Sequence, residues 1–379
     1  MAVYKIFPDK DSTIYSSHPQ MNTGNDSILE VKNVNFNFTP QVARSIIQFN
    51  QKTINGVLSD LVQDNNYHIN LKCFIAKAQG VNFDTKLNVF PISGSWDDGN
   101  GMYLDSPLTT NGVSWGVKTI TPYQEWATSS FSSYVTSSFS PISPGGGNWY
   151  TGPLNTNLEL EGTQNFNQNS TKDLNIQVTD IVNTWFSSSQ EINQTPQIEN
   201  NGFIIKLNDD VEFNSNKDIQ PTFKFYSSNT HTIYPPQLEI KWDDSVFETG
   251  SLPPLDTPIS FIGLANNPSL FTPESIHRFR INTRPKYPER TFKTSSLYTE
   301  NHYIPSSSLY AIKDLDTNEF VINFDSQFTK ISCDQNGNYF DIYMEGLEPE
   351  RYYKILIKTN IDNTTQVHDN KYYFKVING

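Results

Sequence analysis

Phe7-Pro-Asp-Lys-Asp-Ser-Thr-Ile-Tyr15 is the stretch that decides the fold class of this chain, because it ends in three strong strand-forming residues. Asn22-Thr-Gly-Asn25 follows with the residue types that favour a turn. A second apolar run begins at Ile28, and a third ends at Phe49 after another polar break. The order strand, turn, strand, turn, strand predicts an all-β beginning.

The composition extends this prediction to the whole chain. With 379 residues it exceeds the size at which one hydrophobic core usually stops growing, so we expect two domains. Asn, Ser, Thr and aromatic residues are abundant, and helical patterns are short, as is typical of sheets joined by turns. The predicted fold class is therefore all-β.

The charge is strongly negative and unevenly distributed. A formal net charge of −13 argues against nucleic-acid binding through bulk electrostatics, because a phosphate backbone would be repelled. Residues 245–379 carry 13 Lys/Arg and 16 Asp/Glu, a net charge of −3, which leaves −10 to residues 1–244. The acidity belongs to the first part of the chain.

Two cysteines, Cys73 and Cys333, fall in different predicted domains, which excludes a disulfide framework. No apolar segment of signal-peptide length follows Met1, and no window approaches the length of a membrane span. We therefore expect a protein that folds in the cytoplasm where it is made, without a membrane partner.

Alternating patterns predict further strands of the first domain. Apolar and polar residues alternate from 67 to 76, again from Leu174 to Val178, and again from Leu238 to Trp242. A short helix is expected at 180–187, because Thr179 suits an N-cap and the apolar residues after it share one face.

The order of these features resembles the DNRLRE-type jelly-roll module, a β-sandwich of bacterial surface proteins and phage virion proteins. The resemblance covers residues 1 to about 243 and departs from the family at 99–172, where the loops are longer than the family needs. It implies a jelly-roll β-sandwich. The matching stretches are Asp9-Lys-Asp-Ser-Thr-Ile-Tyr with Asn22 and Gly24, Arg44-Ser-Ile-Ile-Gln-Phe, Val89-Phe-Pro-Ile-Ser-Gly-Ser-Trp96, Val178-Thr-Asp-Ile-Val-Asn-Thr-Trp185, Asn201-Gly-Phe-Ile-Ile-Lys, Phe225-Tyr-Ser-Ser and Pro236-Gln-Leu-Glu-Ile.

A second, smaller β-sandwich is expected at 259–379, after a linker at 244–258 that is rich in Pro, Gly and acidic residues. Its segment Leu347-Glu-Pro-Glu-Arg-Tyr-Tyr353 resembles the tyrosine corner of immunoglobulin and fibronectin type III domains. The resemblance implies that the Tyr353 hydroxyl bonds back to the main chain. This resemblance bears on the fold of the domain and not on its function.

No catalytic constellation can be drawn from the sequence. The six histidines have no metal-ligand spacing, and no Gly-x-Ser-x-Gly elbow is present. Pairs of carboxylates that could serve glycoside hydrolysis occur, but we interpret them as residues of turns and solvent-facing surfaces. We therefore expect a protein that is not an enzyme and has no cofactor.

Clustered carboxylate and amide side chains suggest a structural Ca²⁺ ion as the metal hypothesis for this chain. Asp97, Asp98 and Asn100, or alternatively Asp9 and Asp11, offer the hard oxygen ligands that calcium prefers.

The 94–172 region carries aromatic residues spaced by Ser, Thr, Gly and Pro, and long loops of this kind are usually functional or interfacial. Trp and Tyr side chains either stack on sugar rings or dominate subunit interfaces, and both alternatives remain open. The interface or glycan candidates are Trp115, Trp126, Trp149, Tyr103, Tyr123 and Tyr150.

A basic interval stands out between His277 and Lys293. It is either a solvated strand edge or an extended arm that docks on an acidic neighbouring subunit. Its candidate interface residues are Arg278, Arg280, Arg284, Lys286, Arg290 and Lys293.

These observations lead to two functional hypotheses. The first is a non-enzymatic virion structural protein, in the tail, neck or capsid decoration, because the chain is similar to structural proteins of tailed phages of the T4-like marine kind. Its partners would be other virion proteins and further copies of itself, assembled in the host cytoplasm. The second is a carbohydrate-binding surface module that recognises a host-surface glycan.

Overall fold

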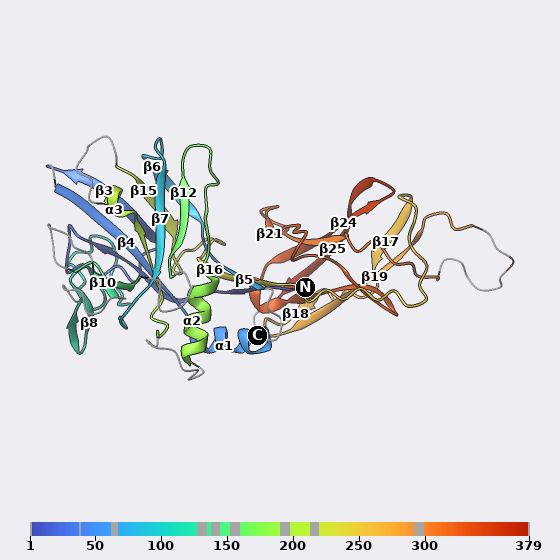
Figure 1. Cartoon of the computed structure of the whole chain (residues 1–379), viewed down its shortest axis with the longest axis horizontal. Coiled ribbons are helices and arrows are strands. Elements are labelled where there is room, and N and C mark those ends of the chain that lie inside the picture. The colour runs from blue at the N-terminus through green and yellow to red at the C-terminus, as the bar shows by residue number, and fades with distance from the viewer. Residues whose placement is uncertain are drawn as a thin grey trace. The chain divides into compact units, whose positions relative to one another are not determined.

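The computed structural model describes residues 2–37, 39–61, 67–126, 135–137, 145–151, 160–189, 198–212, 220–289, 292 and 299–377 (Figure 1). Strands dominate these residues and helices are few, which confirms the all-β sandwich prediction. No helix among the described residues is long and apolar enough to cross a membrane.

The chain divides into two compact units. One unit is Ile6–Glu239, and the other combines Ile240–Gly379 with Met1–Lys5. The first five residues therefore belong with the C-terminal part of the chain, which the sequence does not predict. Val3 lies in the core of the C-terminal unit, and the Lys5 ammonium donates a 2.9 Å hydrogen bond to the carbonyl oxygen of Val321.

The first unit is built around one large curled sheet with the strand order β12-β7-β14-β4-β3-β15-β6, in which β2 also pairs with β4. A smaller sheet contains β16, β5 and β13 in that order. The strands of the large sheet are β2 (Pro8–Tyr15), β3 (Ile28–Phe36), β4 (Thr39–Phe49), β6 (Ile75–Gln79), β7 (Thr85–Pro91), β12 (Gly162–Phe166), β14 (Phe203–Leu207) and β15 (Thr222–Tyr226); those of the smaller sheet are β5 (Tyr67–Cys73), β13 (Leu174–Gln177) and β16 (Gln237–Trp242).

The strand predicted at 67–76 changes sheets at its end. Ile69, Leu71 and Cys73 are fully buried, as the alternating pattern predicts. After Phe74 the chain leaves β13 and pairs with β15 as β6, so one run of sequence contributes to both sheets. The chain thus passes from the smaller sheet to the large sheet between Cys73 and Ile75.

The two longer helices described in this unit contact each other: α1 (Gln51–Leu61) and α2 (Thr179–Ser189). The predicted helix at 180–187 is confirmed as α2. Sequence reasoning missed α1, although Asn50 is a recognisable cap: its side-chain oxygen accepts the backbone N–H groups of Lys52 and Thr53 at 2.9 and 3.2 Å. A short helix, α3 (Asp209–Glu212), follows β14.

The region predicted as elaborate loops contains short strands and packs over the large sheet. Strand β14 is buried at all five positions, where a half-exposed strand would alternate. Ile204 of β14 and Ile46 of β4 share a hydrophobic cluster with tryptophans of the loop region, so that region covers their face of the sheet. The short strands are β8 (Val117–Ile120), β9 (Tyr123–Glu125), β10 (Val135–Ser137) and β11 (Asn148–Tyr150).

The C-terminal unit is a sandwich of two sheets with the orders β17-β19-β23-β22 and β18-β25-β24-β20-β21. If β17, β19, β20, β22, β23, β24 and β25 are lettered A to G, the sheets read ABED and CFG, which is the immunoglobulin order. The elements are β1 (Ala2–Ile6), β17 (Ser260–Leu264), β18 (Leu270–Phe271), β19 (Ile276–Pro285), β20 (Leu309–Asp314), β21 (Phe320–Ile322), β22 (Ser332–Asp334), β23 (Gly337–Tyr343), the 3₁₀ turn Met344–Gly346, β24 (Tyr352–Ile361) and β25 (Thr364–Val376).

The segment 244–258 is not a free linker, contrary to the sequence prediction. Leu255 is 3% exposed and belongs to the core of the C-terminal unit. Phe247 and Pro254 form bridges with Cys333 and Tyr303, so the segment runs along the sandwich as an extra edge. Proline and acidic residues suggested a solvated chain, but its few apolar residues find partners in the tertiary structure.

Candidate functional site

The three candidate tryptophans are core residues. Trp115, Trp126 and Trp149 are 0, 1 and 4% exposed and pack with Trp96 against the large sheet. The prediction that their side chains form a contact surface or stack on sugars is therefore wrong. Sequence reasoning recognised the aromatic content of the loops but could not tell that the loops fold back onto the sheet.

A buried ion pair lies beneath these tryptophans. The guanidinium of Arg44 donates two hydrogen bonds of 2.7 Å to the Glu212 carboxylate, and both side chains are fully buried. The same guanidinium lies 5.0 Å from the Trp115 ring centroid and 5.1 Å from that of Trp149. Lys206 adds a second cation, 3.2 Å from Glu212. This arrangement attaches the loops to the sheet, and its burial leaves no access for a substrate.

Gly146 completes this arrangement. Its φ of +85° is a conformation that L side chains rarely adopt, and a Cβ atom there would lie 2.7 Å from the Trp115 ring. Its carbonyl oxygen accepts a 2.5 Å hydrogen bond from Arg44. The Gly-rich turn is therefore required by close packing around the guanidinium.

Among the candidate tyrosines, Tyr103 and Tyr123 are 43 and 63% exposed, whereas Tyr150 is half-buried. Tyr103 packs on Tyr15, with ring centroids 5.0 Å apart. The Tyr123 hydroxyl donates to the carboxylate of Glu125 at 2.9 Å. Among the described aromatic residues of this region, Tyr103 and Tyr123 supply the exposed area.

The calcium candidates have different surroundings, although Asp97, Asp98 and Asp9 all lie in the electrostatic field of Lys10. Asp97 is exposed, and the side-chain oxygen of Asn100 accepts a hydrogen bond of 2.5 Å from Asn111. Asp98 also lies in the electrostatic field of Asp11, and each of these two carboxylates has a buried Oδ1 without a hydrogen-bond partner. Burial raises the pKa of Asp11 to about 7, and burial together with the charge of Asp11 raises the pKa of Asp98 to about 7.

Within the described ranges, no group of three or more His, Cys, Asp or Glu side chains is placed to hold a metal ion. A calcium ion at either predicted set, Asp97, Asp98 and Asn100 or Asp9 and Asp11, would therefore need main-chain or amide oxygens as well. Calcium binding stays a prediction.

The first part of the basic interval lies in β19, with Arg278 and Arg280 on the solvent-facing side of the strand. Arg278 forms a two-pronged ion pair with Asp341 at 2.9 and 2.8 Å, and Arg280 does the same with Asp334 at 2.8 and 2.7 Å. Both guanidinium groups lie over the ring of Tyr339. These hydrogen bonds raise the arginine pKa values and engage both cations within the domain.

The end of the interval remains on the surface. Arg284 lies 5.0 Å over the ring of Phe261 on the neighbouring strand β17, and Lys286 lies 5.7 Å from the ring of Tyr287. Ile259, Phe261 and Tyr287 are 60, 46 and 75% exposed. We call these five residues the β17 edge patch. Arg290 and Lys293 lie outside the described residues.

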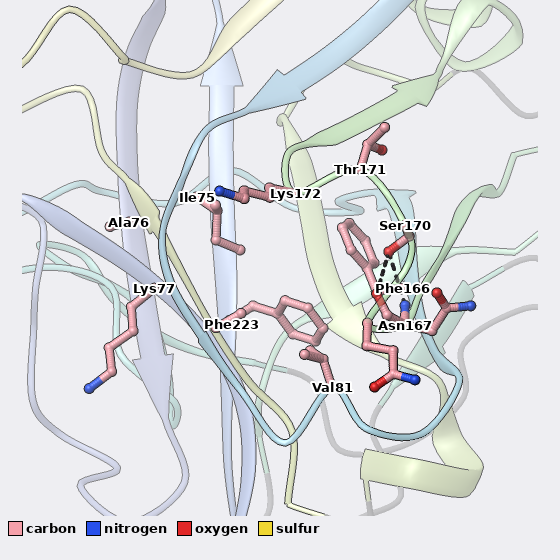
Figure 2. A pocket seen from close by; sticks show the side chains of 12 residues that line it. Ile75, Ala76, Lys77, Val81, Phe166, Asn167, Ser170, Thr171, Lys172 and Phe223 are labelled. Carbon is pink, nitrogen blue, oxygen red and sulfur yellow. Dashed lines mark hydrogen bonds between the residues drawn. The ribbon is translucent and has the colours of Figure 1, made fainter.

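A pocket of ≈ 400 Å³ lies in the first unit between β6 and the connection from β12 to β13 (Figure 2). Ile75, Val81, Phe166 and Phe223 form its apolar lining. Polar groups of the 167–172 turn and two lysines complete its wall. Sequence reasoning missed this pocket, because its lining comes from segments almost 150 residues apart. The lining residues are Ile75, Ala76, Lys77, Ala78, Val81, Phe166, Asn167, Gln168, Ser170, Thr171, Lys172 and Phe223.

Comparison of the chain with known proteins finds no match, either to a protein-family model or to a curated protein.

Proposed function

We propose that this protein is a non-enzymatic structural component of a bacteriophage virion, in the tail, neck or capsid decoration, and that it acts through protein–protein contacts. The observation that carries the proposal is the β17 edge patch. Exposed Phe261 and Tyr287 stand there with Arg284, and aromatic residues and arginine are the residue usage of protein interfaces. The virion setting comes from the sequence resemblance, and assembly would take place in the host cytoplasm.

The charge distribution favours contacts between copies of this chain. The patch is basic, whereas residues 1–244 carry a net charge of −10. Opposite charge on two different surfaces supports a head-to-tail contact, which builds a ring or a longer array. Homo-oligomerisation is thus part of the proposal.

Light scattering of the purified protein across a concentration series tests the proposal. We expect a defined oligomer at low salt and a lower mass at high salt, because screening weakens contacts between surface charges. Arg284→Glu should lower the mass. Lys313→Glu is the matched control, since Lys313 also lies over an exposed ring, that of Phe320, but on the other sheet. A wild-type monomer at every concentration would contradict self-assembly.

A carbohydrate-binding surface module is the second candidate. The pocket in Figure 2 favours it, because amide and hydroxyl groups of Asn167, Gln168, Ser170 and Thr171 line a concave site. Retention of the protein on host-surface polysaccharides tests this alternative. Absence of retention would remove it for the isolated protein.

A further inference from the structure

We propose that the pocket in Figure 2 is a docking site for an extended, acidic peptide segment of a partner protein, which adds to the large sheet along β6. This mode of recognition, in which a strand joins a free sheet edge, combines main-chain hydrogen bonds with pockets for alternate side chains.

Both edges of the large sheet reach this pocket. Among the described residues, the sheet order begins at β12 and ends at β6. Residues of β6 line one side of the pocket, and Phe166, the last residue of β12, lines the other with the turn that follows. The Phe166 ring meets that of Phe223 on β15 at a centroid distance of 5.1 Å, so the curl brings the two ends of the sheet together. A strand placed here would occupy the interval between them.

The first residue of β6 already donates a backbone hydrogen bond to a carboxylate at the point where the pairing of β13 with β5 ends. Strand β13 pairs with β5 as far as Leu174, which lies opposite Cys73. One step beyond this pair, the side chain of Asp173 accepts the N–H of Ile75 at 2.9 Å. The residues that follow on β6, Ala76–Gln79, are exposed. A peptide that continues the line of β13 would meet this exposed stretch.

The apolar lining suits an aliphatic side chain better than a sugar ring. Phe166 and Phe223 are only 3 and 0% exposed, so neither presents a ring face on which a pyranose could stack. Ile75 and Val81 complete the apolar lining beside these two rings (Figure 2). A volume of ≈ 400 Å³ accommodates one or two side chains of a docked strand.

Two lysines at the pocket favour an acidic occupant, with Lys172 directed toward Ile75 (Figure 2). Lys77 and Lys172 are exposed members of the lining, in a part of the chain whose net charge is −10. The opposite wall is preformed: the Ser170 hydroxyl donates to the carbonyl oxygen of Asn167 at 2.8 Å and accepts its N–H at 3.0 Å (Figure 2). A rigid wall lowers the entropic cost of binding.

This inference deepens the proposed assembly function, on which its biological meaning rests, by naming the kind of segment that a partner would insert. Its test is independent of self-assembly. Light scattering measures contacts between copies, whereas peptide titration measures the pocket alone, so either proposal can fail without the other.

The experiment is a fluorescence-anisotropy titration of the full chain with labelled eight-residue peptides. One peptide alternates Glu and Val, and its counterpart alternates Lys and Val. We expect saturable binding of the Glu-Val peptide and at least about tenfold weaker binding of the Lys-Val peptide. The double variant Lys77→Glu, Lys172→Glu should weaken binding of the Glu-Val peptide by about tenfold, the loss expected for two partly exposed ion pairs.

Two further variants complete the design. Lys52→Glu, at an exposed position of α1, is the matched charge control and should bind like the wild type. Ala78→Trp places a large side chain in the pocket from an exposed position of β6, and should abolish binding while thermal melting confirms the fold. No binding of the Glu-Val peptide, or equal binding by the wild type and the double lysine variant, would overturn the proposal. The proposal would also be overturned if the wild-type protein were retained on a polysaccharide and the Ala78→Trp variant were not.

Discussion

The hydroxyl of Tyr353 donates a 2.9 Å hydrogen bond to the carbonyl oxygen of Glu348, five residues earlier in the chain. This bond closes the corner between β23 and β24, as the Leu-x-Pro lead-in of the sequence predicts. The Tyr353 ring is 1% exposed and packs with Phe374, so one side chain joins the corner to the core.

Tyr353→Phe removes this hydrogen bond and keeps the ring. We expect the free energy of unfolding of the C-terminal unit to fall by about 1–2 kcal/mol, because the Glu348 carbonyl loses its partner. Urea denaturation monitored by fluorescence measures the change. Tyr352→Phe is the control: its ring is 48% exposed, and its stability should match the wild type. Equal losses in both variants would contradict a specific role for the corner.

Arg44→Leu should be far more costly. The substitution leaves the fully buried Glu212 carboxylate with Lys206 as its ion-pair partner among the described residues, and breaking a buried pair in this way typically costs about 3–5 kcal/mol. The loops above the sheet should loosen at the same time, because Trp115 and Trp149 lose the guanidinium between them. Denaturation and tryptophan fluorescence report the two effects.

Lys86→Ala provides the comparison for this prediction. Lys86 pairs with Glu161 at 3.7 Å, and both side chains are about 40% exposed, so the change should remain within about 1 kcal/mol. A small effect of Arg44→Leu, similar to that of Lys86→Ala, would show that the buried network contributes little.

Asp11→Asn should alter the dependence of stability on pH. The pKa of Asp11 is raised from 3.8 to about 7 in the folded protein by burial, so the folded state binds more protons than the unfolded state between these values. The corresponding stabilisation is complete below pH 3.8 and is lost as the pH rises through about 7. An asparagine stays neutral, and its side-chain oxygen can still accept the Ser228 N–H.

The melting temperature of Asp11→Asn relative to the wild type should therefore rise between pH 5 and pH 8. Asp98→Asn should behave in the same direction, since burial and the Asp11 charge raise its pKa to about 7. A difference in melting temperature that is constant over this range would show that neither carboxyl group titrates in it.

The calcium hypothesis predicts a separate effect at pH 8, where both carboxyl groups are ionised. Ca²⁺ at about 100 times its Kd should stabilise the fold by about 2–3 kcal/mol, and a chelator should reverse this shift in melting temperature. Asp98→Asn should remove the response where Asp97, Asp98 and Asn100 hold the ion, and Asp11→Asn should remove it where Asp9 and Asp11 do. A melting temperature unchanged by chelator would exclude structural calcium.

Local patterns were sufficient for much of the fold. Alternation identified the buried face of β5, Thr179 and the apolar residues after it identified α2, and Asn336-Gly337 marks the turn between β22 and β23. Each of these signals lies within a few residues of the element that it specifies. The same is true of the tyrosine corner, which is complete within seven residues.

The surroundings of the candidate site residues depend on contacts with residues that are distant in the sequence. Trp115 faces the sheet because it packs against Arg44 and Gly146. Arg280 is held in an ion pair because Asp334 lies beside it on the same sheet. Neither partner can be found by periodicity.

Local sequence patterns were enough to predict the all-β class and several strands of the first unit, because strand and turn preferences act between near neighbours. Only the tertiary structure decided that the aromatic loops are core, that residues 244–258 pack on the second sandwich and that the edges of the large sheet share a pocket. Those outcomes depend on which apolar faces meet across the fold, and burial of a side chain is a property of its partners as much as of its own chemistry.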